Sequence, residues 1–307
     1  MKVLIVANNN TGKYTTFIVE QVEALRRLGI EIDFYGVHGK GAIGYLSNRR
    51  NLIKKIKQFH PDIIHAHYGL SGLLANLQRM IPVVTTYHGS DIHTGGKNLF
   101  FSRLSILLSA YNIFVSKRLL DQSGYHGRKQ CVLSCGINET LFHPIERGEA
   151  RKQLNWDNDG IYILFAGAFD NKIKNSPLAK AAISLVSNAK LIELRGYTRE
   201  QVCQAMNAAN CLLVTSFQEG SPLVAKEAMA CGTPVVSVDV GDVKETTHGL
   251  DGYYITTYNE QDIATCLQKA ISFQGKTEGR ERILKIGLSH ELIAQRIMEI
   301  YNSIISN

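Results

Sequence analysis

The stretch that decides the fold spans residues 219–236 and reads EGSPLVAKEAMACGTPVV. An apolar run of strand length precedes it, and another begins after Pro234. Between these runs we expect a helix that Ser221 caps, that has Pro222 at its first position, and that ends at Gly232. The stretch therefore predicts a strand, a tight turn, a helix and a second strand, which is the repeating unit of a parallel α/β sheet.

The turn before this helix has the character of an anion site. The first amides of a helix, here those of Leu223 and Val224, find no acceptor inside the helix and carry the positive end of its dipole. Open α/β sheets bind ligands at this carboxyl edge of their strands. Glu219 and Glu227 flank the turn and would repel a phosphate, so they suit hydrogen bonds to sugar and ribose hydroxyls. Considered alone, they also fit a solvated loop residue and a carboxylate that stabilises the helix dipole.

The rest of the chain repeats this alternation of strand and helix. Apolar runs of strand length form two series, separated by a polar segment near residues 146–160, and helically spaced apolar residues lie between the runs. Continuous apolar strands separated by helices indicate parallel sheets covered on both faces. We therefore expect an α/β fold with two doubly wound, Rossmann-like domains facing a central cleft. The expected domains are 1–145 and 146–290, followed by a C-terminal helix at 291–307.

Composition places the chain among ordinary globular proteins. Of its 307 residues 45% are apolar and 20% charged, and 34 Lys and Arg against 27 Asp and Glu give a formal net charge of +7. This excludes a disordered chain, and the longest apolar runs fall far short of the about 20 residues of a membrane span. The opening MKVLIVA reads as a buried strand rather than a signal peptide, so a cytoplasmic location is expected. The six cysteines include no C-x-x-C pair, which favours reduced thiols and no bound metal.

The same string carries a resemblance to a known family. Two glutamates with seven residues between them, followed by AMACGTPVV, resemble the signature of the large retaining glycosyltransferase group often called family 4, which has the GT-B fold. The resemblance covers nearly the whole chain and implies a C-terminal helix that crosses back to the first domain. Further similar stretches, in the family's order, are FIVEQV at 17–22, PDIIHAH at 61–67, VVTTYHGSD at 83–91, VLSCGIN at 132–138, LFHP at 141–144 and VGDVKE at 240–245.

The resemblance implies a site for a nucleotide-diphosphate sugar, the donor, in the second domain. Glu227 would hold the ribose hydroxyls, the amides of Leu223 and Val224 would meet the phosphates, and Tyr197 would lie beside the base. No metal cofactor is expected, because cations and helix amides can stabilise the leaving diphosphate. The residues assigned to donor binding are Lys172, Gly167, Gly196, Tyr197, Gly220, Ser221, Leu223, Val224 and Glu227.

The resemblance also assigns a catalytic set. Lys174 would be the cation for the diphosphate, Glu219 would hold the donor sugar, and His88 of the first domain would lie near donor sugar and acceptor. Asp91 is placed on the acceptor side, and it could equally cap the turn after His88. The implied reaction retains the anomeric configuration, with the acceptor hydroxyl attacking on the face that the diphosphate leaves and a donor phosphate oxygen taking its proton.

One position departs from the family pattern. The family has an arginine directly after the glycine at 167, and this chain has Ala168 there. Lys172 and Arg195 are the candidate replacements for its charge. The departure removes one positive charge from the groups that would stabilise the leaving diphosphate.

Three functions fit these residues. The first is retaining hexosyl transfer from a nucleotide sugar to an acceptor hydroxyl, in cell-envelope polysaccharide or lipid-linked glycan synthesis. The second is a nucleotide-sugar epimerase of the same fold, which would need acid and base side chains around the sugar. The third is a non-catalytic subunit that binds a sugar nucleotide, for which Ala168 is the best support.

A basic segment at residues 46–59 suggests a further partner. Its apolar residues recur at near-helical spacing, and its basic residues are Arg49, Arg50, Lys54, Lys55 and Lys57. Such a helix can lie on an anionic membrane surface, where lipid-linked acceptors occur, so a peripheral location on the inner face of the membrane is one expectation. The alternative is a helix that covers the first sheet and has a solvated basic face. Nucleic acid is not an expected partner, since aromatic residues are not interleaved with the charges.

Overall fold

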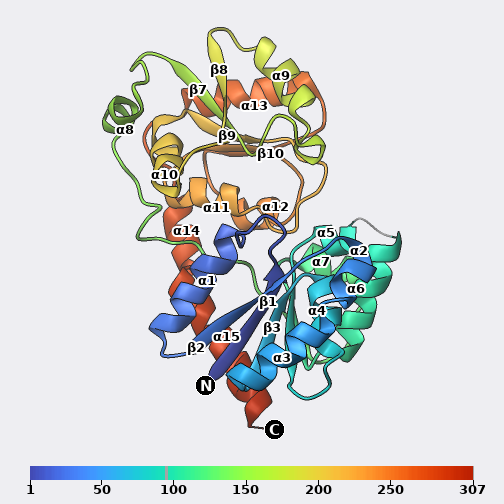
Figure 1. Cartoon of the computed structure of the whole chain (residues 1–307). Helices are drawn as coiled ribbons and strands as arrows, with labels where there is room; N and C mark the ends of the chain where they lie inside the picture. The colour runs from blue at the N-terminus through green and yellow to red at the C-terminus, as the bar shows by residue number, and fades with distance from the viewer. Residues whose placement is uncertain (94–95, 307) are drawn as a thin grey trace. The chain divides into compact units, whose positions relative to one another are not determined.

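The computed structural model describes residues 1–93 and 96–306 and divides the chain into two compact units (Figure 1). Unit 1 comprises Met1–Gly136 and the chain from His290 onward, and unit 2 comprises Ile137–Ser289. The sequence placed the boundary at residues 145 and 146, whereas the units divide directly before Ile137. The reason is a backbone pairing: Ile137 N donates to Leu288 O at 2.8 Å, so the chain from this residue joins the 288–289 segment of unit 2.

Unit 1 is built on a six-stranded parallel sheet with the order β2-β1-β3-β4-β5-β6. Its strands are β1 Lys2–Asn8, β2 Glu31–Val37, β3 Ile63–His67, β4 Val83–Tyr87, β5 Tyr111–Phe114 and β6 Gln130–Val132. Every residue of β3 and β4 is buried, as the continuous apolar runs predict. The chain leaves β1 toward β2 on one side and reaches β3 on the other, so the switch point at which such sheets bind ligands lies between β1 and β3.

Helices cover both faces of this sheet. They are α1 Thr16–Arg27, α2 Gly41–Leu46, α3 Arg49–Phe59, α4 Gly69–Asn76, α5 Ser90–His93, α6 Gly96–Leu108, α7 Lys117–Ser123 and α15 His290–Ile305. Side chains alternate between the faces of a strand. Accordingly Ile64 and Ala66 of β3 join the core formed with α3 and α4, while His65 between them meets Tyr301 of α15. Helix α15 lies beside α1 (Figure 1) and thus belongs to unit 1.

Unit 2 is built on a five-stranded parallel sheet with the order β11-β10-β9-β7-β8. Its strands are β7 Ile161–Phe165, β8 Ala189–Glu193, β9 Cys211–Val214, β10 Val235–Val238 and β11 Tyr253–Thr256. The chain goes from β7 outward to β8 and returns on the other side of β7 to β9, which places the switch point between β7 and β9. Two doubly wound parallel sheets confirm the predicted α/β fold class.

The helices of unit 2 also divide between two faces (Figure 1). They are α8 Arg147–Leu154, the short 3₁₀ helix η1 Lys172–Lys174, α9 Ser176–Ser184, α10 Arg199–Ala208, α11 Leu223–Ala230, α12 Val243–Thr247, α13 Glu260–Ser272 and α14 Gly279–Lys285. On one face α9 and α13 pack on Ile163, Phe165 and Leu213. Helices α10 and α11 contact strands β7, β9 and β10 from the other face. The switch point is therefore flanked by the starts of α9 and α11.

One helix of unit 1 approaches its neighbours so closely that it needs glycine. A Cβ atom on Gly72 of α4 would lie 2.3 Å from Ser105 Oγ of α6 and 2.6 Å from Thr85 Cγ2 of β4. The absence of a side chain lets α4 lie against both elements. Asn76, the last residue of α4, donates its Nδ2 to the Oγ of Ser109, directly after the end of α6, at 2.9 Å.

We expect Gly72→Ala to lower the free energy of unfolding by about 1–3 kcal/mol, the usual cost of overpacking, even though alanine is the better helix former. Urea unfolding followed by circular dichroism measures this. Gln268→Ala, on the exposed face of α13, is the control and should change stability little. A Gly72→Ala protein as stable as the original would contradict the close approach.

Candidate functional site

The loops after β7 and β9 lie side by side at the switch point of unit 2. Thr215, just after β9, donates its hydroxyl to the carbonyl oxygens of Lys174 at 2.8 Å and Asn175 at 3.1 Å. Two residues further along the chain, Phe217 N donates to Ile173 O at 2.9 Å. These bonds hold η1, which ends the β7 loop, against the loop that leads into α11. Two loops far apart in sequence thus form one edge of the sheet.

Lys174 and Glu219 form an ion pair at this edge. Lys174 Nζ lies 2.6 Å from Glu219 Oε1, and the two side chains are 21% and 15% exposed. Gly167 makes room for the lysine, because a Cβ there would lie 2.6 Å from Lys174 Cγ. The sequence placed all three residues at the site but did not predict the pair. Lys172, the other expected cation, is exposed at the start of η1.

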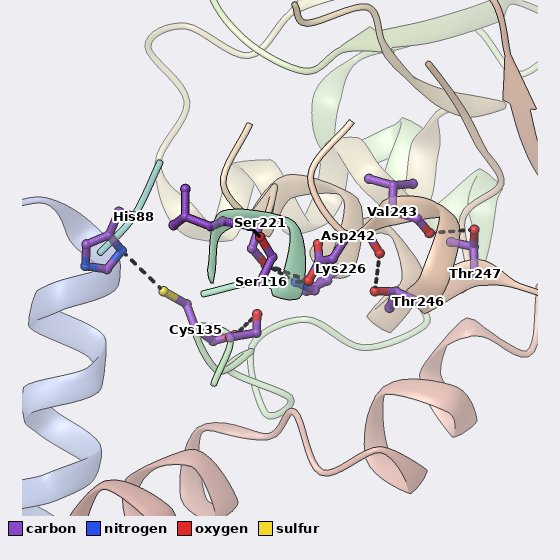
Figure 2. Close-up of polar contacts among 11 residues, drawn as sticks. His88, Ser116, Cys135, Ser221, Lys226, Asp242, Val243, Thr246 and Thr247 are labelled. Atoms are coloured by element: carbon purple, nitrogen blue, oxygen red, sulfur yellow. Dashed lines mark hydrogen bonds and ion pairs between the residues drawn. The ribbon is translucent and has the colours of Figure 1, made fainter. Parts of the chain in front are cut away.

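The start of α11 differs from the prediction. The helix begins at Leu223 with Pro222 in the N-cap position, and no side chain caps it. Ser221, the expected cap, instead donates its hydroxyl to Asp242 Oδ2 at 2.9 Å (Figure 2). The reason is Lys226, whose buried ammonium group also contacts Ser221 Oγ and lies 2.6 Å from Asp242 Oδ2. A buried ammonium group without acceptors costs more free energy than a helix N-terminus without a side-chain cap.

Sequence reasoning missed the pair of Lys226 and Asp242. Lys226 is 2% exposed and sits in the otherwise apolar face of α11. A lysine inside such a helix is the signal that could have found it, because a buried ammonium requires a carboxylate nearby. The pair draws the loop before α12 onto the turn before α11, where a Cβ on Gly241 would lie 2.6 Å from Pro222 Cδ. Gly220 is buried in that turn.

Glu227 lies deeper in α11 and is paired with a residue that the sequence did not single out. Its side chain is 4% exposed, and its Oε1 atom lies 2.7 Å from Arg199 Nη1 at the start of α10. Gly196, with φ of +84°, forms the turn between β8 and α10. Tyr197 in this turn is half-buried, and burial raises the pKa of its hydroxyl. The ion pair therefore connects the expected base-binding turn to the expected ribose-binding carboxylate.

His88, which the sequence placed at the site, lies in unit 1 beside two histidines of β3 that were not assigned to it. His65 and His67 point to one face of β3, and their rings stack with centroids 4.6 Å apart. His88 follows β4, and its Nε2 lies 3.0 Å from His67 Nδ1. On its other side, His88 Nδ1 lies 3.9 Å from Cys135 Sγ (Figure 2). Both ring nitrogens of His88 thus have partners within unit 1.

Burial keeps these histidines neutral. It lowers the pKa of His65 and of His88 to about 3. Burial, together with the two neighbouring rings, also lowers the pKa of His67 well below its ordinary value. At neutral pH each imidazole has one N–H and one acceptor nitrogen. His88 can therefore give or take a hydrogen bond but supplies no positive charge.

Asp91 holds the turn that carries His88. The residue is 8% exposed, and its carboxylate accepts hydrogen bonds from the amides of Gly69 at 3.1 Å, His88 at 3.2 Å and Gly89 at 2.9 Å. Burial raises its pKa, against the amides, which lower it. Of the two expectations for Asp91, the turn cap is the arrangement that the structure has.

Neither a metal-binding cluster nor a membrane span occurs in the part of the chain that the structure describes. In residues 1–93 and 96–306, no three His, Cys, Asp or Glu side chains are placed to hold a metal ion. In the same ranges, no helix is both long enough and apolar enough to cross a bilayer. That the protein needs no metal stays a prediction.

Family models match both halves of the chain in order. A model described as "Glycosyl transferase 4-like" matches residues 3–122, and one described as "Glycosyl transferases group 1" matches residues 149–272. The first match covers most of the sheet of unit 1, and the second covers that of unit 2.

Curated relatives are distant in sequence. The chain is 26% identical over 275 residues to a "D-inositol 3-phosphate glycosyltransferase" of Actinosynnema mirum, covering 71% of this chain and 66% of the relative. It is 27% identical over 223 residues to the "putative teichuronic acid biosynthesis glycosyltransferase TuaC" of Bacillus subtilis, covering 62% and 57%. The chain thus spans less than two thirds of the length of these relatives.

Solved structures share the fold over the full chain. Sucrose-phosphate synthase from Thermosynechococcus elongatus matches with a TM-score of 0.86 at 18% identity, covering 100% of this chain and 99% of that one. Anabaena HepE in complex with UDP and glucose matches with a TM-score of 0.78 at 18% identity, covering 99% and 100%. At these identities the similarity shows the fold alone, and it confirms the GT-B expectation.

We expect the buried histidines to make the protein less stable in acid. A folded-state pKa below the unfolded value of about 6.5 gives stability that is present above pH 6.5 and lost as the pH falls toward 3. From pH 7.5 to 5.0, His65 alone should account for about 2 kcal/mol of lost unfolding free energy. Urea unfolding of the original protein and of His65→Asn at both pH values measures this difference. The exposed His126→Asn is the control, and an equal acid loss in His65→Asn and the original protein would refute the prediction.

Proposed function

This chain belongs to the glycosyl transferases of group 1, and from that membership we propose its function. The protein moves a hexose from a nucleotide-diphosphate sugar to an acceptor hydroxyl and retains the anomeric configuration. The observation that carries the proposal is the Lys174–Glu219 ion pair at the switch point of unit 2, directly before the start of α11. A cation, a carboxylate and helix amides at one sheet edge suit a substrate that combines a diphosphate with a sugar.

The donor site is proposed to lie along this edge. Lys174 Nζ faces the diphosphate, and its pairing with Glu219 orients the carboxylate toward the sugar hydroxyls. Glu227 accepts hydrogen bonds from the ribose hydroxyls, and Tyr197 packs against the base. The remaining groups of the site are the amides of Leu223 and Val224, the turn at Gly220 and Ser221, the space at Gly167, the turn at Gly196 and the exposed cation of Lys172.

The reaction needs no side-chain nucleophile. The acceptor oxygen forms its bond to the anomeric carbon on the face from which the diphosphate departs, and the bond from that carbon to the phosphate oxygen breaks. The acceptor proton passes to an oxygen of the departing diphosphate. Lys174 and the α11 amides stabilise the charge that develops there, and such electrostatic stabilisation usually accelerates transfer reactions more than any other single effect. Glu219, held by Lys174, binds the sugar rather than attacking it.

The unit 1 residues are proposed to serve the acceptor side. A neutral His88 can donate one hydrogen bond to a sugar or acceptor hydroxyl if it exchanges a present partner, His67 or Cys135, for the substrate. Asp91 contributes by holding the backbone of His88 and Gly89.

We place the reaction in cell-envelope polysaccharide or lipid-linked glycan synthesis, on the cytoplasmic side of the membrane. The name of the Bacillus relative, teichuronic acid biosynthesis, supports an envelope polymer. Membrane contact through α3 would be electrostatic, because its apolar residues Leu52 and Ile56 are buried in the core of unit 1. The exposed cations of α3 are Arg49, Arg50, Lys54 and Lys57. Arg49 donates to Leu77 O at 3.2 Å, so Arg50, Lys54 and Lys57 are the ones proposed to face anionic lipids.

Ala168 favours a second candidate function, a subunit that binds the sugar nucleotide without turning it over. The family's arginine is missing there, and Arg195, one candidate replacement, is engaged with Asp170. Binding of a sugar nucleotide with no transfer to any acceptor would favour this candidate.

We expect one of UDP, GDP or ADP, or a sugar derivative of it, to stabilise the protein in a thermal-shift screen with and without divalent metal. At about 100 times its dissociation constant, a ligand adds about 2.7 kcal/mol. Lys174→Ala and Glu227→Gln should lose this shift because each removes a charge from the donor site. Lys269→Ala, an exposed cation of α13, is the control and should keep it. Absence of any shift across the screen would count against the donor site.

We expect the protein to sediment with vesicles containing phosphatidylglycerol at low salt and to release them as salt screens the charges. Replacement of Arg50, Lys54 and Lys57 by glutamate should abolish this binding. The control replaces three exposed cations of unit 2, Lys180, Lys269 and Lys285, by glutamate and should bind nearly as well. Equal losses in the two triple variants would mean that net charge, not α3, governs sedimentation.

A further inference from the structure

Glu227 is a buried carboxylate that forms an ion pair with a residue of another helix. Its side chain is 4% exposed and sits in the second turn of α11, in the stretch from Ala225 to Ala230 that is buried throughout. A carboxylate in such surroundings stays charged only if a cation or strong donors compensate the lost hydration. Arg199 Nη1, 2.7 Å from Glu227 Oε1, supplies that compensation.

Arg199 is itself held in place from two sides. It is the first residue of α10, directly after a capping box in which Gln201 N donates to Thr198 Oγ1 at 3.3 Å and Thr198 N donates to Gln201 Oε1 at 2.9 Å. Its guanidinium lies 4.6 Å from the ring centroid of Phe142. Planar guanidinium groups bind well in such stacked positions. The start of α10 and the Phe142 ring therefore fix where the cation lies.

The position of the Phe142 ring is itself fixed by burial and hydrogen bonds. It is fully buried, its amide donates to Asn138 O at 2.8 Å, and its carbonyl oxygen accepts from Arg280 Nη1 at 2.8 Å. Position and direction of the Glu227 carboxylate are thus set through Arg199 and Phe142 by a segment that precedes the sheet of unit 2.

We infer that Arg199 is a positioning residue for the nucleotide ribose, acting through Glu227. It keeps the carboxylate charged and turned so that it accepts hydrogen bonds from the ribose hydroxyls. A carboxylate offers about four acceptor sites, so a guanidinium N–H and ribose hydroxyls can bond to it together. The inference rests on the proposed function, in which Glu227 meets the ribose.

The position in the fold agrees with this role. Arg199 follows the turn of Gly196 and Tyr197, which is the proposed base site, and it pairs with the helix whose start is the proposed phosphate site. The ribose lies between base and phosphates in every nucleoside diphosphate. An arginine that connects the two elements is therefore placed to act on the ribose.

The test compares a nucleoside diphosphate with its 2′,3′-dideoxy counterpart, which lacks the hydroxyls that Glu227 would bind. Isothermal titration calorimetry gives the dissociation constants of UDP, GDP and ADP, and then of the dideoxy form of whichever binds. We expect the original protein to bind the dideoxy form at least about tenfold more weakly, the usual size for a hydrogen bond to a charged group. In Arg199→Ala this ratio should fall toward one, because the full nucleotide loses affinity while the dideoxy form loses little.

Arg199→Lys and Lys269→Ala are the companion variants. The lysine introduced by Arg199→Lys keeps a positive charge beside Glu227 but lacks the planar guanidinium, so this variant should retain part of the affinity ratio between the full and the dideoxy nucleotide. The exposed Lys269 of α13 should leave the ratio unchanged when it is replaced. Circular dichroism and thermal unfolding without ligand report whether Arg199→Ala still folds, and Arg199→Lys carries the test if it does not.

Three results would overturn the inference while the proposed function stands. In the first, the original protein binds the nucleotide but does not discriminate against the dideoxy form. In the second, Arg199→Ala loses affinity for both forms equally. In the third, Arg199→Ala binds the full nucleotide more tightly than the original protein does. The last result would mean that Arg199 competes with the ribose. If none of UDP, GDP and ADP binds the original protein, the proposed function fails, and this inference fails with it.

Discussion

The buried ammonium group of Lys226 is the constraint on which the loops around the start of α11 depend. A lysine that is 2% exposed must have acceptors, and Asp242 and Ser221 supply them from two different loops. The contact draws the loop before α12 onto the turn before α11, where Gly241 leaves room for Pro222. The direction of that turn then decides where Glu219 and the first amides of α11 lie. A charge that touches no substrate in the proposal therefore shapes the site that would bind one.

The proposed working charges of unit 2 are paired in a similar way. Lys174 pairs with Glu219, and Glu227 pairs with Arg199, so each carboxylate is held by a cation from a neighbouring loop or helix. The three clustered histidines of unit 1 are neutral rather than paired as ions. Burial keeps them neutral, and hydrogen bonds and ring stacking join them, which makes that cluster a source of hydrogen bonds rather than of charge.

Most of the fold was predictable because its signals are local. Continuous apolar runs mark buried parallel strands, and helical spacing between them marks the covering helices, so both sheets were expected. The start of α11 was misjudged, since Ser221 looked like a cap when read with its neighbours in sequence alone. The domain boundary was placed too late because a polar segment after Pro144 is a stronger sequence signal than the backbone pairing of Ile137 with Leu288.

By itself the sequence determined the α/β class, the two sheets, the family resemblance and the residue types at the carboxyl edge of unit 2. These follow from periodicity and from motifs that are contiguous in the chain. Only the tertiary structure decided which charges meet. Arg199 and Glu227 lie on different helices. Lys226 lies on α11, and Asp242 lies in the loop before α12. No spacing along the chain therefore predicts either pair. The physical reason is that a buried charge pairs with an opposite charge that lies close in space. The order of the strands in the sheet sets those distances, and the local sequence pattern does not contain that order.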